Sequence, residues 1–120
     1  MPSLFEISAG KLAGPTTGGT VTQATNKTTG VTLNTESGQI TMNNAALGAA
    51  AEATFTVTND KIAATDVVVA CHASVGSGSY LVGVSAIAAG SFKVTVTNVS
   101  GGSLSQAIVI NFVALKGASS

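Results

Sequence analysis

The chain has 120 residues, of which only 8% are charged, and its five lysines and five acidic residues give a formal net charge of zero. This length corresponds to one domain. The lysines stand singly along the chain and there is no arginine, whereas proteins that bind nucleic acids or anionic membranes cluster their basic residues. The composition therefore argues against both kinds of partner.

Targeting and redox signals are equally sparse. The N-terminal residues Met1 to Glu6 lack the basic and apolar regions of a secretion signal, and no apolar run approaches the length of a membrane-spanning helix. Cys71 is the only cysteine, so an internal disulfide is excluded. We expect a protein that is made in a reducing cytoplasm.

Residues 1–19 differ from the rest of the chain. They place four large apolar residues, Leu4, Phe5, Ile7 and Leu12, among glycines and a proline. Such a segment does not hold a helix and cannot close a core by itself. One interpretation is a frayed terminus. We favour an extended N-terminal arm whose four apolar residues are anchors that bind a partner.

From Thr20 onward, hydroxyl and small apolar residues alternate with a period of two, which is typical of strands with one buried face. Turn residues such as Asn26, Asn59, Gly90 and the segment 74–78 separate the runs. Strands are predicted at Thr20–Thr25, Gly30–Leu33, Gly38–Met42, Glu52–Thr58, Asp66–His72, Ser79–Ile87, Ser91–Asn98 and Gln106–Leu115. Residues 20–120 are therefore expected to form an all-β domain, an antiparallel β-sandwich or jelly roll of about eight short strands, with a small barrel as an alternative.

Two segments read as strands that are buried on both faces, Val67–Cys71 and Ile108–Val113. Such strands are either central or have an outer face that meets another subunit. Because the core residues are mostly small, an isolated monomer is expected to be modestly stable, which favours assembly. The segment Asn43–Ala51 predicts a turn or a single loose helical turn.

The sequence offers little catalytic chemistry. His72 is the only histidine, and the adjacent Cys71 points to the opposite face if both lie in one strand. We interpret His72 as structural and Cys71 as a small buried hydrophobe. The carboxylates are scattered at Glu6, Glu36, Glu52, Asp60 and Asp66. We predict no enzyme, no metal site, no cofactor and no small-molecule substrate.

The aromatic residues point mainly to packing. Phe55 and Phe92 follow the inward alternation of their predicted strands, and Tyr80 is the only tyrosine. Glycan-binding sites usually present several exposed aromatic rings. Loops around Tyr80 are the one place where such a site is expected.

Several segments resemble a small β-domain of virion proteins from tailed bacteriophages, found in head proteins and at the ends of fibre proteins. These segments are Gly19–Gln23, Thr29–Asn34, Gly38–Leu47, Gly90–Val94, Asn98–Ser105 and Ile108–Phe112. The resemblance covers about residues 19–117. It implies a jelly-roll-like subunit, a homotrimer and no catalytic residues.

Within that family, a short arm followed directly by the domain favours a capsid decoration (cement) protein on the head surface. Its partner would be the major capsid protein, and its location the virion, after synthesis in the host bacterial cytoplasm. The alternative is a tail fibre or spike tip that binds a host receptor or glycan.

Overall fold

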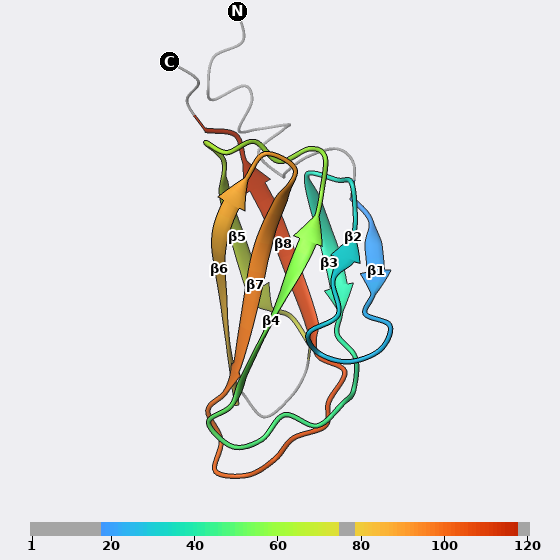
Figure 1. Ribbon diagram of the computed structural model, residues 1–120, viewed down its shortest axis with the longest axis vertical. Helices are drawn as coiled ribbons and strands as arrows, with labels where there is room; N and C mark the ends of the chain where they lie inside the picture. Colours follow the sequence, from blue (N-terminus) through green and yellow to red (C-terminus); the bar gives the residue numbers. More distant parts are fainter. Residues whose placement is uncertain (1–17, 75–78, 118–120) are drawn as a thin grey trace, which may run out of the picture.

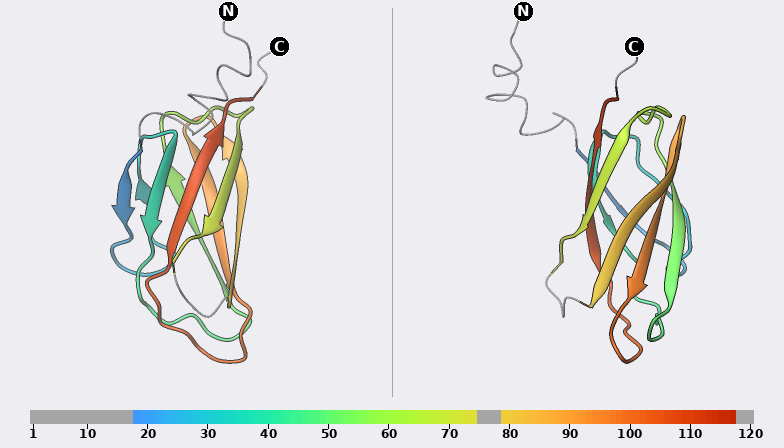
Figure 2. Two further views of the ribbon diagram at one scale, coloured as in Figure 1. Left: turned by 180° about the vertical axis from the view of Figure 1, so that it is seen from behind. Right: turned by 90° about the vertical axis from the view of Figure 1, so that its left-hand side faces the viewer.

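The computed structural model describes residues 18–74 and 79–117, and this part of the chain contains eight strands and no helix. Two four-stranded sheets lie face to face (Figures 1 and 2), which confirms the expected all-β sandwich rather than a closed barrel. The strands are β1 (Thr20–Thr22), β2 (Val31–Thr32), β3 (Ser37–Thr41), β4 (Glu52–Thr58), β5 (Val67–His72), β6 (Tyr80–Ala88), β7 (Ser91–Asn98) and β8 (Val109–Leu115).

The two sheets have the strand orders β1-β3-β8-β5, here called sheet A, and β2-β4-β7-β6, here called sheet B. Strands β1 to β6 alternate between the sheets, and only the β6–β7 hairpin joins neighbours of one sheet. The expectation of purely antiparallel pairing is wrong for two pairs, because β1 pairs with β3 and β2 with β4 in parallel. In each pair the chain crosses to the other sheet and returns, so both strands run in the same direction.

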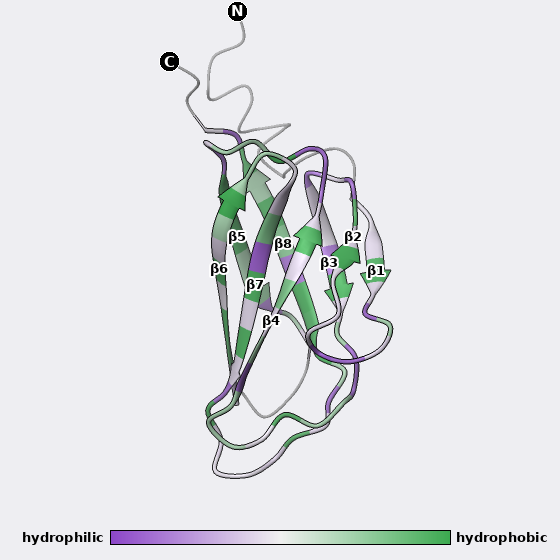
Figure 3. Ribbon diagram, viewed as in Figure 1, coloured by the Kyte–Doolittle hydropathy of each residue, from purple (hydrophilic) through white to green (hydrophobic). Residues whose placement is uncertain are grey.

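The alternating sequence explains which face of each strand is buried. In β4 and β7, Phe55 lies opposite Val94 with both side chains in the core. Their neighbours Thr54 and Thr95 point outward, and their hydroxyl oxygens are 2.7 Å apart. Figure 3 shows the same alternation as changing hydropathy along these two strands.

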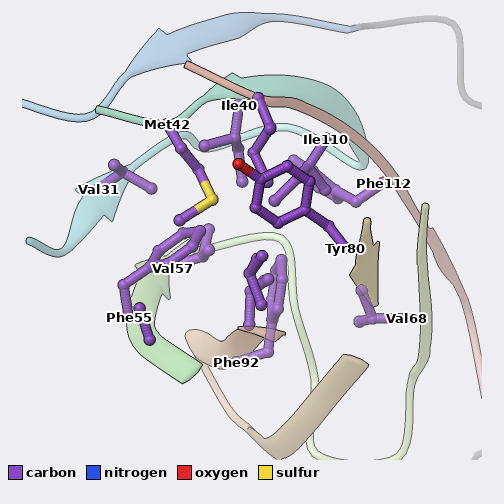
Figure 4. Packing of buried hydrophobic residues seen from close by; sticks show 14 of the residues in the cluster. Val31, Ile40, Met42, Phe55, Val57, Val68, Tyr80, Phe92, Ile110 and Phe112 are labelled. Carbon is purple, nitrogen blue, oxygen red and sulfur yellow. The ribbon is translucent and has the colours of Figure 1, made fainter. Parts of the chain in front are cut away.

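Between the sheets lies one core of aliphatic and aromatic side chains (Figure 4). The rings of Phe92 and Phe112, from opposite sheets, are 5.4 Å apart at an interplanar angle of 59°. Phe55 and Phe92 are both buried, which confirms their predicted inward orientation. The fully enclosed members include Ile40, Met42, Val57, Val94, Val96 and Ile110.

The connections follow their turn chemistry. Four asparagines each accept a hydrogen bond from the backbone N–H two residues ahead, which closes a local turn; they are Asn26, Asn43, Asn59 and Asn98. The segment Asn43–Ala51 contains a turn and no helix, as predicted, and its Leu47 forms an isolated antiparallel bridge with Leu104. Residues 75–78 of the β5–β6 connection and the arm to residue 17 lie outside the described residues.

Candidate docking surface

The outer face of sheet A carries a strip of apolar side chains where β5 lies beside β8. Cross-strand pairing sets Val67 opposite Leu115 and Val69 opposite Val113. We call these four residues the apolar strip. Val67, Val69 and Leu115 are 54%, 49% and 52% exposed, although all three are large apolar residues. Half-exposed apolar residues in a contiguous cluster are typical of a surface that binds another molecule.

The structure excludes one of the two alternatives predicted for the apolar run of β5, that of a central strand, and an outer face that meets another subunit stays a prediction. β5 is the edge strand of sheet A, and only its inward-facing residues, such as Val68, contact the core. Cys71 is exposed, so its interpretation as a buried hydrophobe is wrong. The apolar run on β5 arose because both faces carry valines, one set for the core and one for the outer surface. β8 is central, as one alternative expected, but its outer face is open enough to leave Asn111 exposed.

The outward positions of β3, β8 and β5 contain no charged residue. Gln39 and Asn111 bond to each other there, with Gln39 Nε2 donating to Asn111 Oδ1 at 3.0 Å. These positions are Ser37, Gln39, Thr41, Val109, Asn111, Val113, Leu115, Val67, Val69 and Cys71.

The outer face of sheet B has the opposite character. Threonines fill most outward positions of β4 and β7, and Glu52 and Lys93 add one charge of each sign. Leu81 on the edge strand β6 is the exception, with 62% of its surface exposed. A hydroxyl-rich face with mixed charges is an ordinary solvated surface. The two outer faces of the sandwich therefore differ, and sheet A has the one suited to binding.

His72 lies at the end of β5 in a small polar cluster. Its Nε2 atom is 2.8 Å from the Ser74 hydroxyl oxygen, which in turn accepts a hydrogen bond from the Val109 N–H. The imidazole ring packs edge-on against Tyr80, with ring centroids 5.5 Å apart. These contacts hold the β5 terminus against β6 and β8.

Tyr80 itself belongs to the core. Only 5% of the residue is exposed, its ring lies among core side chains (Figure 4), and burial raises the pKa of its phenol. The ring is therefore not available to stack on a sugar, which removes the aromatic platform expected near these loops.

The described carboxylates stay apart. Glu36 lies between β2 and β3, Glu52 begins β4, Asp60 and Asp66 both lie on the β4–β5 connection, and Glu6 is outside the described residues. Within residues 18–74 and 79–117, no group of three His, Cys, Asp or Glu side chains gathers that could hold a metal ion.

Asp66 is the one buried carboxylate of residues 18–74 and 79–117, and it joins the start of β5 to the end of β8. Its Oδ2 atom accepts hydrogen bonds from Lys116 Nζ at 2.6 Å and from the Ala63 N–H at 2.9 Å, and Oδ1 accepts one from the Gly117 N–H at 3.2 Å. The hydrogen bond from Lys116, followed by that from Ala63, lowers the pKa of the Asp66 carboxyl. A side chain at residue 117 would collide with the Thr65 backbone, so the contact requires glycine.

A second buried polar cluster, which sequence reasoning missed, joins three connections at the opposite end. Gln23 donates to the carbonyls of Lys27 and Thr29 and accepts from the Asn43 N–H. Lys27 Nζ donates to the carbonyls of Asn43 and Gln106, and burial lowers its pKa. The partners of Gln23 and Lys27 in this cluster are backbone carbonyl and N–H groups, so no pattern of charged residues in the sequence could have revealed the contacts.

Comparison with known proteins adds no relative. No family model matches the chain, and neither the curated proteins nor the solved structures contain a match. Among the described residues there is also no helix of the length and apolarity needed to cross a membrane. The four predicted arm anchors, Leu4, Phe5, Ile7 and Leu12, lie outside the described residues.

Proposed function

We propose that this chain is a structural protein of a bacteriophage virion, a capsid decoration protein that binds the outer surface of the head and stabilises the shell. The single observation that supports attachment is the uncharged outer face of sheet A with its half-exposed apolar strip. The phage assignment itself rests on the sequence resemblance. The major capsid protein is the proposed partner.

The apolar strip suits a static attachment. Burying apolar surface contributes about 25 cal/mol per Å² without requiring charged partners, so its strength depends little on salt. Val67, Val69 and Leu115 together offer enough surface for a small contact, which the four apolar residues of the arm would extend. Many copies, each bound by such a contact, would fasten neighbouring capsid subunits together.

The jelly-roll assignment is part of the same proposal. The alternation of strands between two four-stranded sheets supports it, whereas the parallel pairs β1–β3 and β2–β4 depart from a purely antiparallel jelly roll. For the fibre-tip alternative, the expected contribution of Tyr80 is absent because that ring is in the core. We therefore favour the head.

Binding to undecorated heads tests the proposal. Purified protein should bind saturably and raise the temperature at which the heads break. Leu115→Lys places a charge in the apolar strip and should abolish binding, while Leu81→Lys makes the same change at an exposed residue of sheet B and should not. Absence of saturable binding by the unaltered protein would refute the proposal, whereas equal binding by Leu115→Lys would show that attachment does not use the apolar strip.

A further inference from the structure

The four edge strands of the sandwich differ in how they are protected against pairing with another chain. Natural proteins block such pairing with very short edge strands, bulges, charges or proline. β1 has three residues and β2 has two. β6 is long, but its pairing with β7 is interrupted between Ser85 and Ala88, where Ala86 adopts a positive φ of 53°.

β5 has none of these devices. Its six residues, Val67–His72, pair with β8 without a register shift and include no lysine, acidic residue or proline. Among the described residues no strand forms a hydrogen-bonded ladder with its outer edge, although β6 of the other sheet runs close beside β5 (Figure 2). An uncharged, regular strand with a free row of backbone N–H and carbonyl groups is a template for strand addition.

We propose that β5 pairs with β5 of a second copy, antiparallel and around a two-fold axis, so that the two A sheets become one continuous sheet of eight strands. A strand that pairs with itself must be self-complementary, because whenever residue i of one copy lies opposite residue j of the other, j also lies opposite i. The outward residues Val67, Val69 and Cys71 meet this condition because all are uncharged and exposed in the single copy.

The sequence of β5 selects the register. Directly opposite residues in an antiparallel pair point to the same face, so the two-fold axis must lie midway between the two copies of one residue. Placing Val69 or Ala70 at the axis pairs five residues of the strand with the partner. With Val69 on the axis, Val67 lies opposite the partner's Cys71, and Asp66 lies opposite the partner's His72. With Ala70 on the axis, the acidic residue lies opposite the partner's Ser74. The Val69 register is favoured because it pairs the three exposed, uncharged residues Val67, Val69 and Cys71 only with one another. The Ala70 register instead sets Val67 opposite the partner's Ala73, outside the strand.

The pair would extend the apolar strip without burying it, because edge-to-edge pairing leaves the outer face of sheet A exposed. Joining two A sheets sets the strips of both copies side by side and doubles the uncharged face. The inference stands apart from the proposed virion role, because it concerns the isolated protein. It specifies a two-fold contact, whereas the sequence resemblance implies a trimer.

Particle mass in solution gives the first test on the full chain. Light scattering behind size-exclusion chromatography should show twice the chain mass at high protein concentration. Val69→Lys would place two lysines together on the axis and should give single chains, while the matched control Leu81→Lys, on the edge strand of sheet B, should keep the double mass. Circular dichroism shows whether each variant is folded.

Register-specific cross-linking gives the second test and does not depend on a disruptive substitution. In a Cys71→Ser background, Val69→Cys should form a disulfide-linked pair when dissolved oxygen with a copper catalyst oxidises the two thiols, because opposite Cα atoms lie within disulfide range. Leu115→Cys in the same background should not cross-link, since β8 and its counterpart are about 14 Å apart across three strand spacings.

Three results would overturn the pairing. Single chains at every concentration would exclude it. A three-chain mass without the Val69→Cys cross-link would show another interface. Cross-linking through Leu115→Cys in place of Val69→Cys would show that two copies pack face to face through the apolar strip. Loss of head binding with an intact two-chain mass would instead count against the proposed function alone.

Discussion

Gly90 turns the chain between β6 and β7 with a φ of 88°, a backbone conformation that costs most other residues about 1 to 2 kcal/mol. A Cβ added there would meet no atom within 4 Å, so the cost of a substitution comes from the backbone alone. We predict that Gly90→Ala lowers the free energy of unfolding by about 1 kcal/mol. Urea titration followed by circular dichroism measures it.

Gly83 provides the control for this prediction. It lies within β6, also has open space around the position of a Cβ, and has no positive φ. Gly83→Ala should leave stability unchanged or raise it by up to about 0.5 kcal/mol, because alanine restricts the unfolded chain. Equal losses in both variants would mean that the conformation at Gly90 is not the cause.

Gln23 is a buried polar residue whose loss should be costly. Its amide bonds to the backbone of Lys27, Thr29 and Asn43 inside the protein, and Gln23→Ala leaves these groups without their partner. We predict a loss of about 3 kcal/mol in unfolding free energy. Gln39→Ala, which removes an exposed amide bonded to Asn111, should change it by less than about 0.5 kcal/mol. A loss of unfolding free energy for Gln23→Ala as small as that for Gln39→Ala would show that the buried hydrogen bonds of Gln23 do not stabilise the fold.

At the scale of strands, the period of two predicted all eight elements because each strand has one face toward the core. The same rule failed for β5, whose outward Val67 and Val69 match its inward Val68 in polarity. A sequence cannot distinguish a strand that is buried on both faces from one whose second face is apolar but exposed in the single chain. The buried clusters around Gln23 and Asp66 were also hidden, because their partners are backbone groups brought together only by folding.

Asp66 connects two strand ends, and its charge should matter for stability. Its pKa in the folded state lies below the unfolded value of about 3.9, so its contribution is present above that pH and is lost as the pH falls through the folded pKa. We predict that Asp66→Asn unfolds more easily than the unaltered protein at neutral pH and that this difference shrinks toward pH 3 (about one unit below the unfolded pKa).

The control for the Asp66 prediction is Asp60→Asn. Asp60 is 4.0 Å from Lys61 in an ion pair whose side chains are both more than half exposed, and such pairs contribute little. Urea midpoints of both variants across this pH range give the comparison. A constant difference for Asp66→Asn would show that its role is steric rather than electrostatic.

For the whole molecule, the sequence predicted two layers but could not give the strand order. β1 and β2 are neighbours in sequence yet belong to different sheets, and each pairs in parallel with the strand after next. Local alternation carries no information on that choice, which depends on how the connections cross the sandwich. Among the described residues, the buried cluster is formed by side chains between Val31 and Ala114.

Deleting residues 1–18 therefore separates folding from attachment. The unfolding free energy should change by less than about 0.5 kcal/mol, because the strands of the described fold begin at Thr20 and its described buried cluster begins at Val31. Attachment to heads should weaken by more than about tenfold, since burying even one large apolar side chain contributes about 2 kcal/mol and the arm has four. A full-length chain with Leu4, Phe5, Ile7 and Leu12 changed to serine should behave like the deletion. If both variants still bind heads as tightly as the unaltered protein, the arm is not an anchor, and attachment must come from the outer face of sheet A alone.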